Sequence, residues 1–170
     1  MQTIAPVTPA HFQELYEIIN DGAQVYQGVI PDDCWHDPYM SPAELQGELA
    51  AGVEFWGCQE AGRFLGVMGR QDRGEVILIR HAYVLRACQQ QGIGSRLLTS
   101  VRSEIQRPIL VGTWAAALWA VRFYQKHGFT LVTPREKDRL LNTYWHITPR
   151  QVETSVVLAD ARWFAVIDPN

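Results

Sequence analysis

The sequence has few cysteines, little net charge and no long apolar run. Its 170 residues include three cysteines, which are far apart and form neither a metal-spaced pair nor an even disulfide set. We therefore expect reduced thiols, no metal site and a cytoplasmic location. The net charge of −3 gives no electrostatic reason to expect a nucleic-acid partner. No apolar run is long enough to span a bilayer and the first residues are not a signal peptide, so we expect no membrane partner.

The hydrophobic content is 47%, which over this length can bury a core and predicts one domain over residues 1–170. Apolar periodicity and turn residues predict strands at 2–7, 53–59, 63–70, 75–84, 108–112, 129–132 and 155–158. Helix signals predict helices at 8–20, 41–51, 92–105 and 115–127, the first of them stopped by Asp21-Gly22. In the connector 133–150, apolar residues at 140, 141, 144 and 145 predict a short helix. The tail 162–167 is a further strand or a packing arm.

A glycine-containing segment joins the predicted strand 75–84 to the helix that follows it. It reads Gln89-Gln90-Gln91-Gly92-Ile93-Gly94. Glycine permits positive φ and close approach of a ligand, and the first helical turn offers unpaired N–H groups at a positive dipole end. A phosphate or pyrophosphate would bind there, although a tight connection without a ligand is the alternative. The Lys-Ser/Thr pair of a P-loop is missing, and so is the first glycine of a dinucleotide fingerprint.

A second motif lies about 30 residues further on. It reads Phe123-Tyr124-Gln125-Lys126-His127-Gly128-Phe129. In this order the two motifs resemble those of the GCN5-related N-acetyltransferase (GNAT) superfamily. The resemblance covers almost the whole chain and implies an α+β fold, a three-layer arrangement with a mixed, splayed sheet of six to seven strands flanked by helices. It also implies acetyl-coenzyme A as co-substrate and no metal.

The resemblance assigns most of the coenzyme contacts to the first motif and its surroundings. Main-chain groups at the end of the strand would hold the pantetheine arm, main-chain N–H groups of the turn would hold the pyrophosphate, and Arg96 would add charge. Many relatives carry an asparagine that contacts the pantetheine where this chain has Ala117. The implied coenzyme-binding residues are Tyr83, Val84, Leu85, Gln89, Gln90, Gln91, Gly92, Ile93, Gly94, Ser95, Arg96, Ala117 and Tyr124.

The implied reaction is direct attack of a neutral amine on the thioester. The Val84 N–H would stabilise the oxyanion, and the Tyr124 phenol would protonate the leaving thiolate. A phenol has a pKa near 10, so at neutral pH it still carries the proton that a thiolate could take up as it forms. An aromatic ring that only packs is the alternative for Tyr124. The acceptor would be a primary amine of a small molecule or an amino-acid-like compound.

The general base is not where the family places it. The glutamate positions of two acetylating branches correspond to Leu78 and Gly112, and a proline common in the family is replaced by Arg86. His81 is a candidate catalytic base because its pKa is near neutral. Strict alternation puts it on the strand face opposite residue 80 unless a bulge breaks the pattern. A structural, hydrogen-bonded histidine is the alternative.

The acceptor pocket is the least defined part of the prediction. By family analogy it would be lined by aromatic residues, with Asp32 and Asp33 suited to a cationic amine, although core and surface roles are the alternative. Two other functions stay open: a non-catalytic acetyl-coenzyme A sensor and an interaction protein of the same fold. The apolar tail after residue 162 would permit a homodimer. The aromatic candidates are Tyr26, Trp35, Tyr39, Tyr144 and Trp145, with His146.

Overall fold

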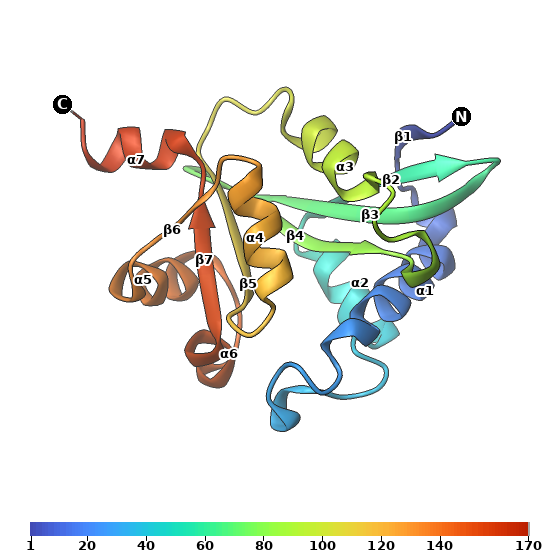
Figure 1. Ribbon diagram of the computed structural model, residues 1–170, viewed down its shortest axis with the longest axis horizontal. Coiled ribbons are helices and arrows are strands. Elements are labelled where there is room, and N and C mark those ends of the chain that lie inside the picture. The colour runs from blue at the N-terminus through green and yellow to red at the C-terminus, as the bar shows by residue number, and fades with distance from the viewer. Residues whose placement is uncertain (170) are drawn as a thin grey trace. The chain divides into compact units, whose positions relative to one another are not determined.

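Seven strands form one mixed sheet in the computed structural model, which describes residues 1–169 (Figure 1). The strand order is β1-β2-β3-β4-β5-β7-β6. Seven α-helices accompany the sheet, so the predicted fold class is confirmed. None of the helices in the described part of the chain is long and apolar enough to cross a membrane.

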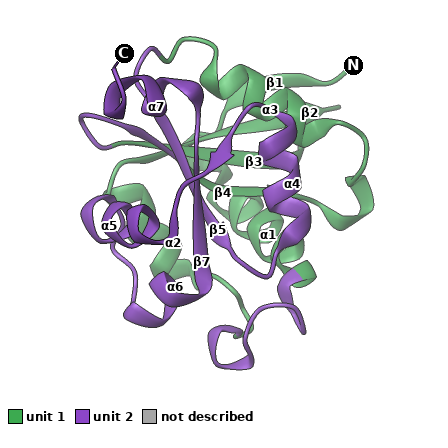
Figure 2. Cartoon of the chain, turned by 60° about the vertical axis from the view of Figure 1, so that its left-hand side comes forward, with its two compact units in different colours: residues 1–25, 36–72, 79–105 green, residues 26–35, 73–78, 106–170 purple. Residues whose placement is uncertain are grey.

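The chain contacts divide into two compact units, each made of several segments (Figure 2). Unit 1 contains residues 1–25, 36–72 and 79–105. Unit 2 contains residues 26–35, residues 73–78 and the chain from 106 onward. Because each unit is discontinuous in sequence, the division does not correspond to two consecutive domains, and the single domain stays a prediction.

Unit 1 holds three whole strands, most of a fourth, and three helices. In Figure 1, α1 and α2 lie on one face of these strands and α3 lies on the other. Apolar side chains of α1 and α2 pack with those of β2 and β3 in one core. The elements are β1 (Thr3–Pro6), α1 (Phe12–Ala23), α2 (Pro42–Ala50), β2 (Val53–Glu60), β3 (Arg63–Asp72), β4 (Ile77–Val84) and α3 (Ile93–Arg102). Short 3-10 turns of this unit lie at Pro9–His11 and Arg86–Cys88; Asp32–Cys34 belongs to unit 2, and Gln24–Tyr26 includes residues of both units.

Local sequence signals explain how several of these elements start and turn. Ser41 caps α2 by accepting a hydrogen bond from the Glu44 N–H (3.1 Å), and the Glu44 carboxylate accepts one from the Ser41 N–H (2.6 Å). The β2–β3 hairpin turns at Ala61 and Gly62, both with positive φ, as a two-residue turn of the right twist requires. The helix predicted from residue 41 and the two strands predicted at 53–59 and 63–70 are therefore confirmed.

The expected stop of α1 at Asp21-Gly22 is wrong, because the helix continues to Ala23. Gly22 instead allows close packing of α1 on the end of β4. A Cβ added at Gly22 would lie 2.9 Å from the Tyr83 Cβ and 3.1 Å from the Val84 carbonyl oxygen. Gly22 is thus needed for the close contact between α1 and β4, and it does not end the helix.

Gly22→Ala is expected to destabilise the protein by about 1–3 kcal/mol, since overpacking outweighs the gain in helix propensity. The matched control is Gly47→Ala in α2, where an added Cβ meets no atom within 4 Å. That substitution is expected to stabilise the protein by about 0.5–1 kcal/mol. Urea unfolding of both variants measures the difference. Equal effects of the two substitutions would contradict the close contact at Gly22.

Unit 2 is built around β7, which pairs antiparallel with both β5 and β6. One core of this unit contains Leu110 of β5, Val157 of β7 and Leu141 of α5. The predicted helix in the connector is confirmed as α5. The elements are β5 (Ile109–Trp114), α4 (Leu118–Lys126), β6 (Thr130–Leu131), α5 (Pro134–Tyr144), α6 (Pro149–Thr154), β7 (Ser155–Ala159) and α7 (Ala161–Ile167).

The tail forms a helix, α7, so the strand interpretation of 162–167 is wrong. Its Trp163 side chain is only 6% exposed and belongs to the same core as Leu110 and Leu141. The alternative of a packing arm is therefore confirmed, in helical form. The segment begins directly after β7, and Asp160 accepts a hydrogen bond from the Ile109 N–H (3.2 Å), which ties the start of this helix to β5.

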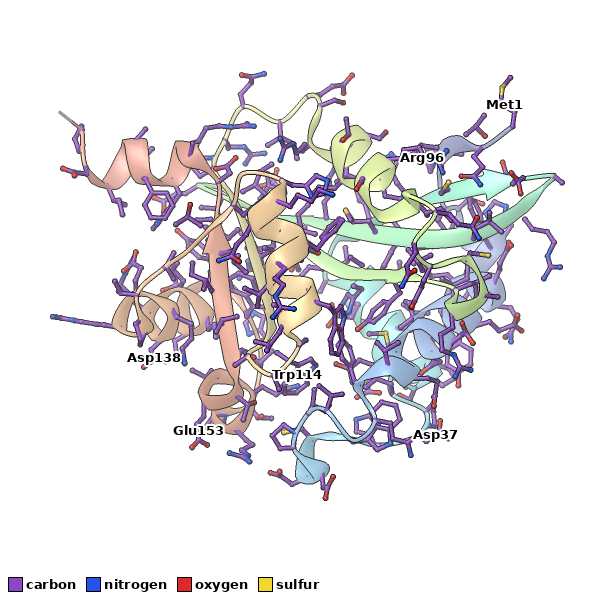
Figure 3. The ribbon with its side chains drawn as sticks, viewed as in Figure 1. Met1, Asp37, Arg96, Trp114, Asp138 and Glu153 are labelled. Atoms are coloured by element: carbon purple, nitrogen blue, oxygen red, sulfur yellow. The ribbon has the colours of Figure 1, made fainter. Side chains whose placement is uncertain are left out.

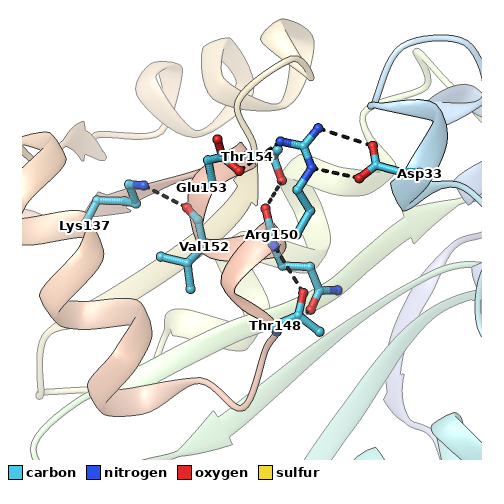
Figure 4. Close-up of polar contacts among 8 residues, drawn as sticks. Asp33, Lys137, Thr148, Arg150, Val152, Glu153 and Thr154 are labelled. Carbon is cyan, nitrogen blue, oxygen red and sulfur yellow. Dashed lines mark hydrogen bonds and ion pairs between the residues drawn. The ribbon is translucent and has the colours of Figure 1, made fainter.

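The segment 26–35 is fastened within unit 2 by an ion pair (Figure 4). The Arg150 guanidinium of α6 donates to both carboxylate oxygens of Asp33, at 2.8 and 3.2 Å, and also contacts Glu153 at 2.9 Å. The hydrogen bonds from Arg150 lower the pKa of the Asp33 carboxyl. Nearby, the Lys137 ammonium donates to the Val152 carbonyl at 2.7 Å, which ties α5 to α6.

Candidate functional site

The turn before α3 is shaped by two residues in the left-handed region. Gln90 has φ +63° and Gly92, the N-cap of α3, has φ +76°. Residues 89–92 are exposed. Left-handed residues that alternate with ordinary ones turn successive N–H groups toward one side and make a concave anion site. The sequence indicated a possible left-handed backbone at the glycine. It did not indicate one at Gln90, because glutamine rarely adopts this conformation.

The first turn of α3 supplies unpaired N–H donors. Its first helical hydrogen bond runs from the Arg96 N–H to the Gly92 carbonyl (3.1 Å), so the N–H groups of residues 93–95 have no partner within the helix. Arg96, labelled in Figure 3, donates to the Gln91 carbonyl (3.2 Å) and to the Gln2 side chain. Its guanidinium thus lies against the turn. Free N–H groups, a helix dipole and one arginine together fit a pyrophosphate.

The end of β4 directs its main-chain groups in alternate directions. The Leu85 N–H donates to the Leu65 carbonyl of β3 (2.9 Å), and the Leu85 carbonyl accepts from the Cys88 N–H (2.8 Å). Because successive N–H groups of a strand point to opposite edges, the Val84 N–H points away from β3. The role of the Val84 N–H as oxyanion donor stays a prediction. At Leu85 only the second lone pair of the carbonyl remains for a pantetheine contact.

Arg86 fixes the exit from β4. Its main-chain N–H donates to Asp21 Oδ2 (2.8 Å), and its guanidinium contacts Asp21 Oδ1 at 3.1 and 3.2 Å. These bonds join the last turn of α1 to the chain just after Val84. Within unit 1, the Tyr83 side chain lies next to Gly22 of α1, and its ring is 6.4 Å from that of Tyr39. A role of Tyr83 in binding the coenzyme stays a prediction.

His81 interrupts the regular alternation of β4. Its φ is +52°, a left-handed conformation that costs an L-residue roughly 1–2 kcal/mol. The His81 Nε2 lies 2.8 Å from Glu48 Oε2, and the neighbouring Arg80 guanidinium lies 2.9 Å from the same oxygen. Two consecutive strand residues therefore reach one carboxylate of α2. The break in alternation and the hydrogen-bonded histidine, which the sequence left as alternatives, occur together.

The surroundings of His81 favour its neutral form. Burial lowers the pKa of His81, and the Arg80 charge lowers it further, while Glu48 only partly opposes this. Burial of Glu48 alone would raise its pKa, but the hydrogen bonds and charges of His81 and Arg80 outweigh burial and lower it. The pair at neutral pH is thus a neutral imidazole beside a carboxylate. Sequence reasoning missed Glu48, because a glutamate on a helix ordinarily indicates only a solvated face.

Helix α4 carries the candidate acid. The Tyr124 side chain is 5% exposed, with its ring 5.0 Å from Phe123 and 5.7 Å from Phe129. Burial raises the pKa of Tyr124 above its ordinary value of 10. The phenol is therefore protonated at physiological pH and carries a proton that it could donate. Ala117, which precedes α4, is fully buried, and its N–H donates to the Trp114 carbonyl (3.0 Å).

Leu78 and Gly112, the two positions where the resemblance would place a glutamate, lie against the core of unit 2. Leu78 is fully buried in that core. A Cβ added at Gly112 would lie 3.3 Å from the Trp145 ring. Neither residue carries a carboxylate, and the identity of the general base stays a prediction.

Among the six residues proposed for the acceptor pocket, four that belong to unit 2 are Tyr26, Tyr144, Trp145 and His146. Tyr144 and Trp145 belong to the core of unit 2, and the Tyr144 hydroxyl donates to Glu75 (2.8 Å), which favours their packing alternative. Tyr26 stacks on Trp119 of α4, with ring centroids 6.0 Å apart, and His146 is exposed. In residues 1–169, no group of three His, Cys, Asp or Glu side chains is arranged to hold a metal ion.

Comparison with known proteins agrees with this architecture. Residues 19–143 match the family model described as an acetyltransferase (GNAT) domain. A Staphylococcus aureus GNAT-family acetyltransferase is similar, with 17% identity, a TM-score of 0.70 and coverage of 94% of this chain and 98% of that one. The PaiA N-acetyltransferase of Thermoplasma acidophilum in complex with coenzyme A is also similar, with 13% identity and a TM-score of 0.71. The match covers 94% of this chain and 98% of that one. An Elizabethkingia anophelis GNAT-family acetyltransferase with acetyl-CoA bound is similar as well, with 22% identity and a TM-score of 0.60. The match covers 94% of this chain and 97% of that one.

The fold is thus that of an acyl-coenzyme A N-acyltransferase. Since the family model spans most of the chain, the protein belongs to the GNAT acetyltransferase family. The comparison with curated protein sequences found no match.

Proposed function

We propose that the protein transfers the acetyl group of acetyl-coenzyme A to the primary amine of a small molecule or amino-acid-like acceptor. The observation that carries the proposal is the turn at Gln90 and Gly92, which presents the unpaired N–H groups of α3 with Arg96 beside them. Two of the similar structures hold coenzyme A or acetyl-coenzyme A, which supports the same ligand for this turn.

The residues of this chain divide the chemistry between them. Acetyl-coenzyme A supplies the activated thioester. The turn and Arg96 bind its pyrophosphate, and Val84 offers an N–H that points away from β3 for the developing oxyanion. Tyr124, kept protonated by burial, donates the proton that the leaving thiolate takes up. His81, kept neutral by its surroundings, accepts a proton from the amine.

The residues at positions 78 and 112 in unit 2 favour a small-molecule acceptor over a protein. Leu78 and Gly112 replace the glutamates of the branches that acetylate histones and ribosomal proteins, and both lie against buried side chains. A protein acceptor of those branches is therefore not favoured. Cys34, Cys58 and Cys88 form no disulfide, which supports a reducing, cytoplasmic location for this activity.

Two measurements test the proposed function. Coenzyme A at millimolar concentration is expected to raise the thermal unfolding midpoint, because a ligand that binds only the native state stabilises it. Thiol release from acetyl-coenzyme A is expected to accelerate with at least one member of a panel of primary amines. An unchanged midpoint would contradict coenzyme binding altogether. Binding without turnover of any amine would favour the alternative, a non-catalytic sensor, which the missing family glutamates leave open.

A further inference from the structure

We infer that Glu48 of α2 is a positioning residue for catalysis, which orients His81 so that its other ring nitrogen, Nδ1, takes the proton of the acceptor amine. This inference rests on the proposed function, since it assigns the base of the same reaction. Neither the family motifs nor the sequence point to Glu48, which lies 33 residues before the histidine it contacts.

The first support is the hydrogen bond itself. Glu48 is ionised at neutral pH, so its carboxylate accepts and the His81 Nε2–H donates, at 2.8 Å. A neutral imidazole carries one N–H, and a proton on Nε2 leaves a lone pair on Nδ1. Within residues 1–169, the bond to Glu48 is the only hydrogen bond of the His81 ring. Nδ1 is therefore the atom that can receive a proton.

The second support is the backbone of His81. A residue in a regular strand has the β conformation, whereas His81 is left-handed at φ +52°. Strain of this kind persists only where the surrounding structure enforces it, and it concentrates at functional sites. Here it turns the imidazole toward α2, three residues before Val84, on the strand that offers the candidate oxyanion donor.

The third support is a network that fixes the carboxylate. Arg80 contacts Glu48 at 2.9 Å and donates to the Gln71 side chain at 2.9 Å. Gln71 is 3% exposed and donates to the Ala51 carbonyl at the end of α2, again at 2.9 Å. The helix that carries Glu48 is thus tied to β3 through Gln71 and to β4 through Arg80 and His81. Such supporting hydrogen bonds are what hold a catalytic base in one orientation.

The groups facing His81 come from three elements. Glu48 approaches from α2 and Arg80 from β4, while β2 contributes the uncharged Phe55 ring, stacked at 6.1 Å. The positive charge of Arg80 opposes protonation, and the negative charge of Glu48 favours it. Removal of the Glu48 charge alone should therefore move the titration of His81 to lower pH.

The proton balance of the proposed step is complete. The acceptor ammonium first gives one proton to His81 Nδ1, directly or through one water. The amine nitrogen then forms the N–C bond while the C–S bond breaks, and the thiolate takes the Tyr124 proton. The second proton lost by the nitrogen restores the phenol through solvent, and the proton on His81 leaves to solvent after the product departs.

The test compares Glu48→Gln with the unmodified enzyme in two pH titrations. The first measures the pH profile of kcat/KM with two amines of different pKa. If the acidic limb of this profile reflects a group of the enzyme, its midpoint is the same with both amines. The second follows the His81 ring by NMR. For Glu48→Gln we expect both the acidic limb and the ring titration to move down by about one pH unit, with the KM for acetyl-coenzyme A unchanged.

The matched variant is His81→Asn, since asparagine tolerates the left-handed backbone and retains an N–H donor for Glu48 but accepts no proton near neutral pH. We expect kcat to fall about 100-fold and the acidic limb to disappear. Turnover by Glu48→Gln with an unshifted limb would overturn the role of Glu48 while leaving the proposed function intact. No turnover by the unmodified protein with any amine would overturn both. A limb retained in His81→Asn would overturn His81 as the base.

Discussion

Gly94→Asp is expected to weaken coenzyme A binding by about 100-fold or more while leaving the fold intact. Gly94 lies in the first turn of α3, whose unpaired N–H groups would hold the pyrophosphate. An aspartate there repels that anion and competes for the same donors. The same carboxylate stabilises the helix, because negative charge is favourable at a helix N-terminus. Binding and stability are therefore expected to change in opposite directions, which a general structural defect would not produce.

Calorimetric titration with coenzyme A, together with urea unfolding, measures both effects. Thr99→Asp is the matched control, since it adds the same charge to an exposed position further along α3. It should leave coenzyme binding within about threefold of the unmodified protein, because surface charges beyond roughly 10 Å are screened at ordinary ionic strength. Coenzyme binding by Gly94→Asp with unchanged affinity would show that the pyrophosphate site lies elsewhere.

Gly92→Val probes the geometry of the turn rather than its charge. The Gly92 φ of +76° is strained for any side chain and worst for a β-branched one, although an added Cβ would meet no atom within 4 Å. Loss of coenzyme affinity is expected here through displacement of the N–H groups. Because the strain destabilises the fold as well, Gly94→Asp remains the sharper of the two tests.

Tyr124→Phe is expected to lower kcat by about 100- to 1000-fold with little change in the affinity for coenzyme A. The substitution removes only the hydroxyl from a buried ring that packs on Phe123 and Phe129, so the packing of α4 is retained. What is lost is general acid catalysis of thiolate departure, which contributes about 10²–10⁴-fold in enzymes. Since burial raises the pKa of Tyr124, its ionisation should produce no limb in the rate profile below pH 10.

Tyr144→Phe is the control for this substitution. Tyr144 is also a buried tyrosine of unit 2, but its hydroxyl donates to Glu75 (2.8 Å) and its ring belongs to the core. Loss of that bond should lower the free energy of unfolding by about 1 kcal/mol and leave kcat unchanged. Steady-state thiol release and urea unfolding of the two variants separate the roles. Equal kcat values for Tyr124→Phe and the unmodified enzyme would contradict Tyr124 as the acid.

The local signals of the sequence predicted most elements of the fold. The Ser41–Glu44 capping box and the Ala61-Gly62 turn each act within a few residues, so their effect can be read from the chain itself. Interpretations failed where the reason for a residue lies far away in sequence. Gly22 appeared to stop a helix but accommodates Tyr83, and the tail 162–167 became a helix because Trp163 packs into a core made by α5 and β5.

The sequence by itself determined the family resemblance, the turn before α3 and the tyrosine of α4, because each is a contiguous motif whose chemistry depends on neighbouring residues. Only the tertiary structure decided what surrounds them. It brought Glu48 to His81 across 33 residues and gave His81 a left-handed backbone that alternation does not predict. It also placed the Trp145 ring against Gly112, 3.3 Å from where a Cβ would lie. Contacts of this kind depend on packing between distant segments, which no local pattern of residue types encodes.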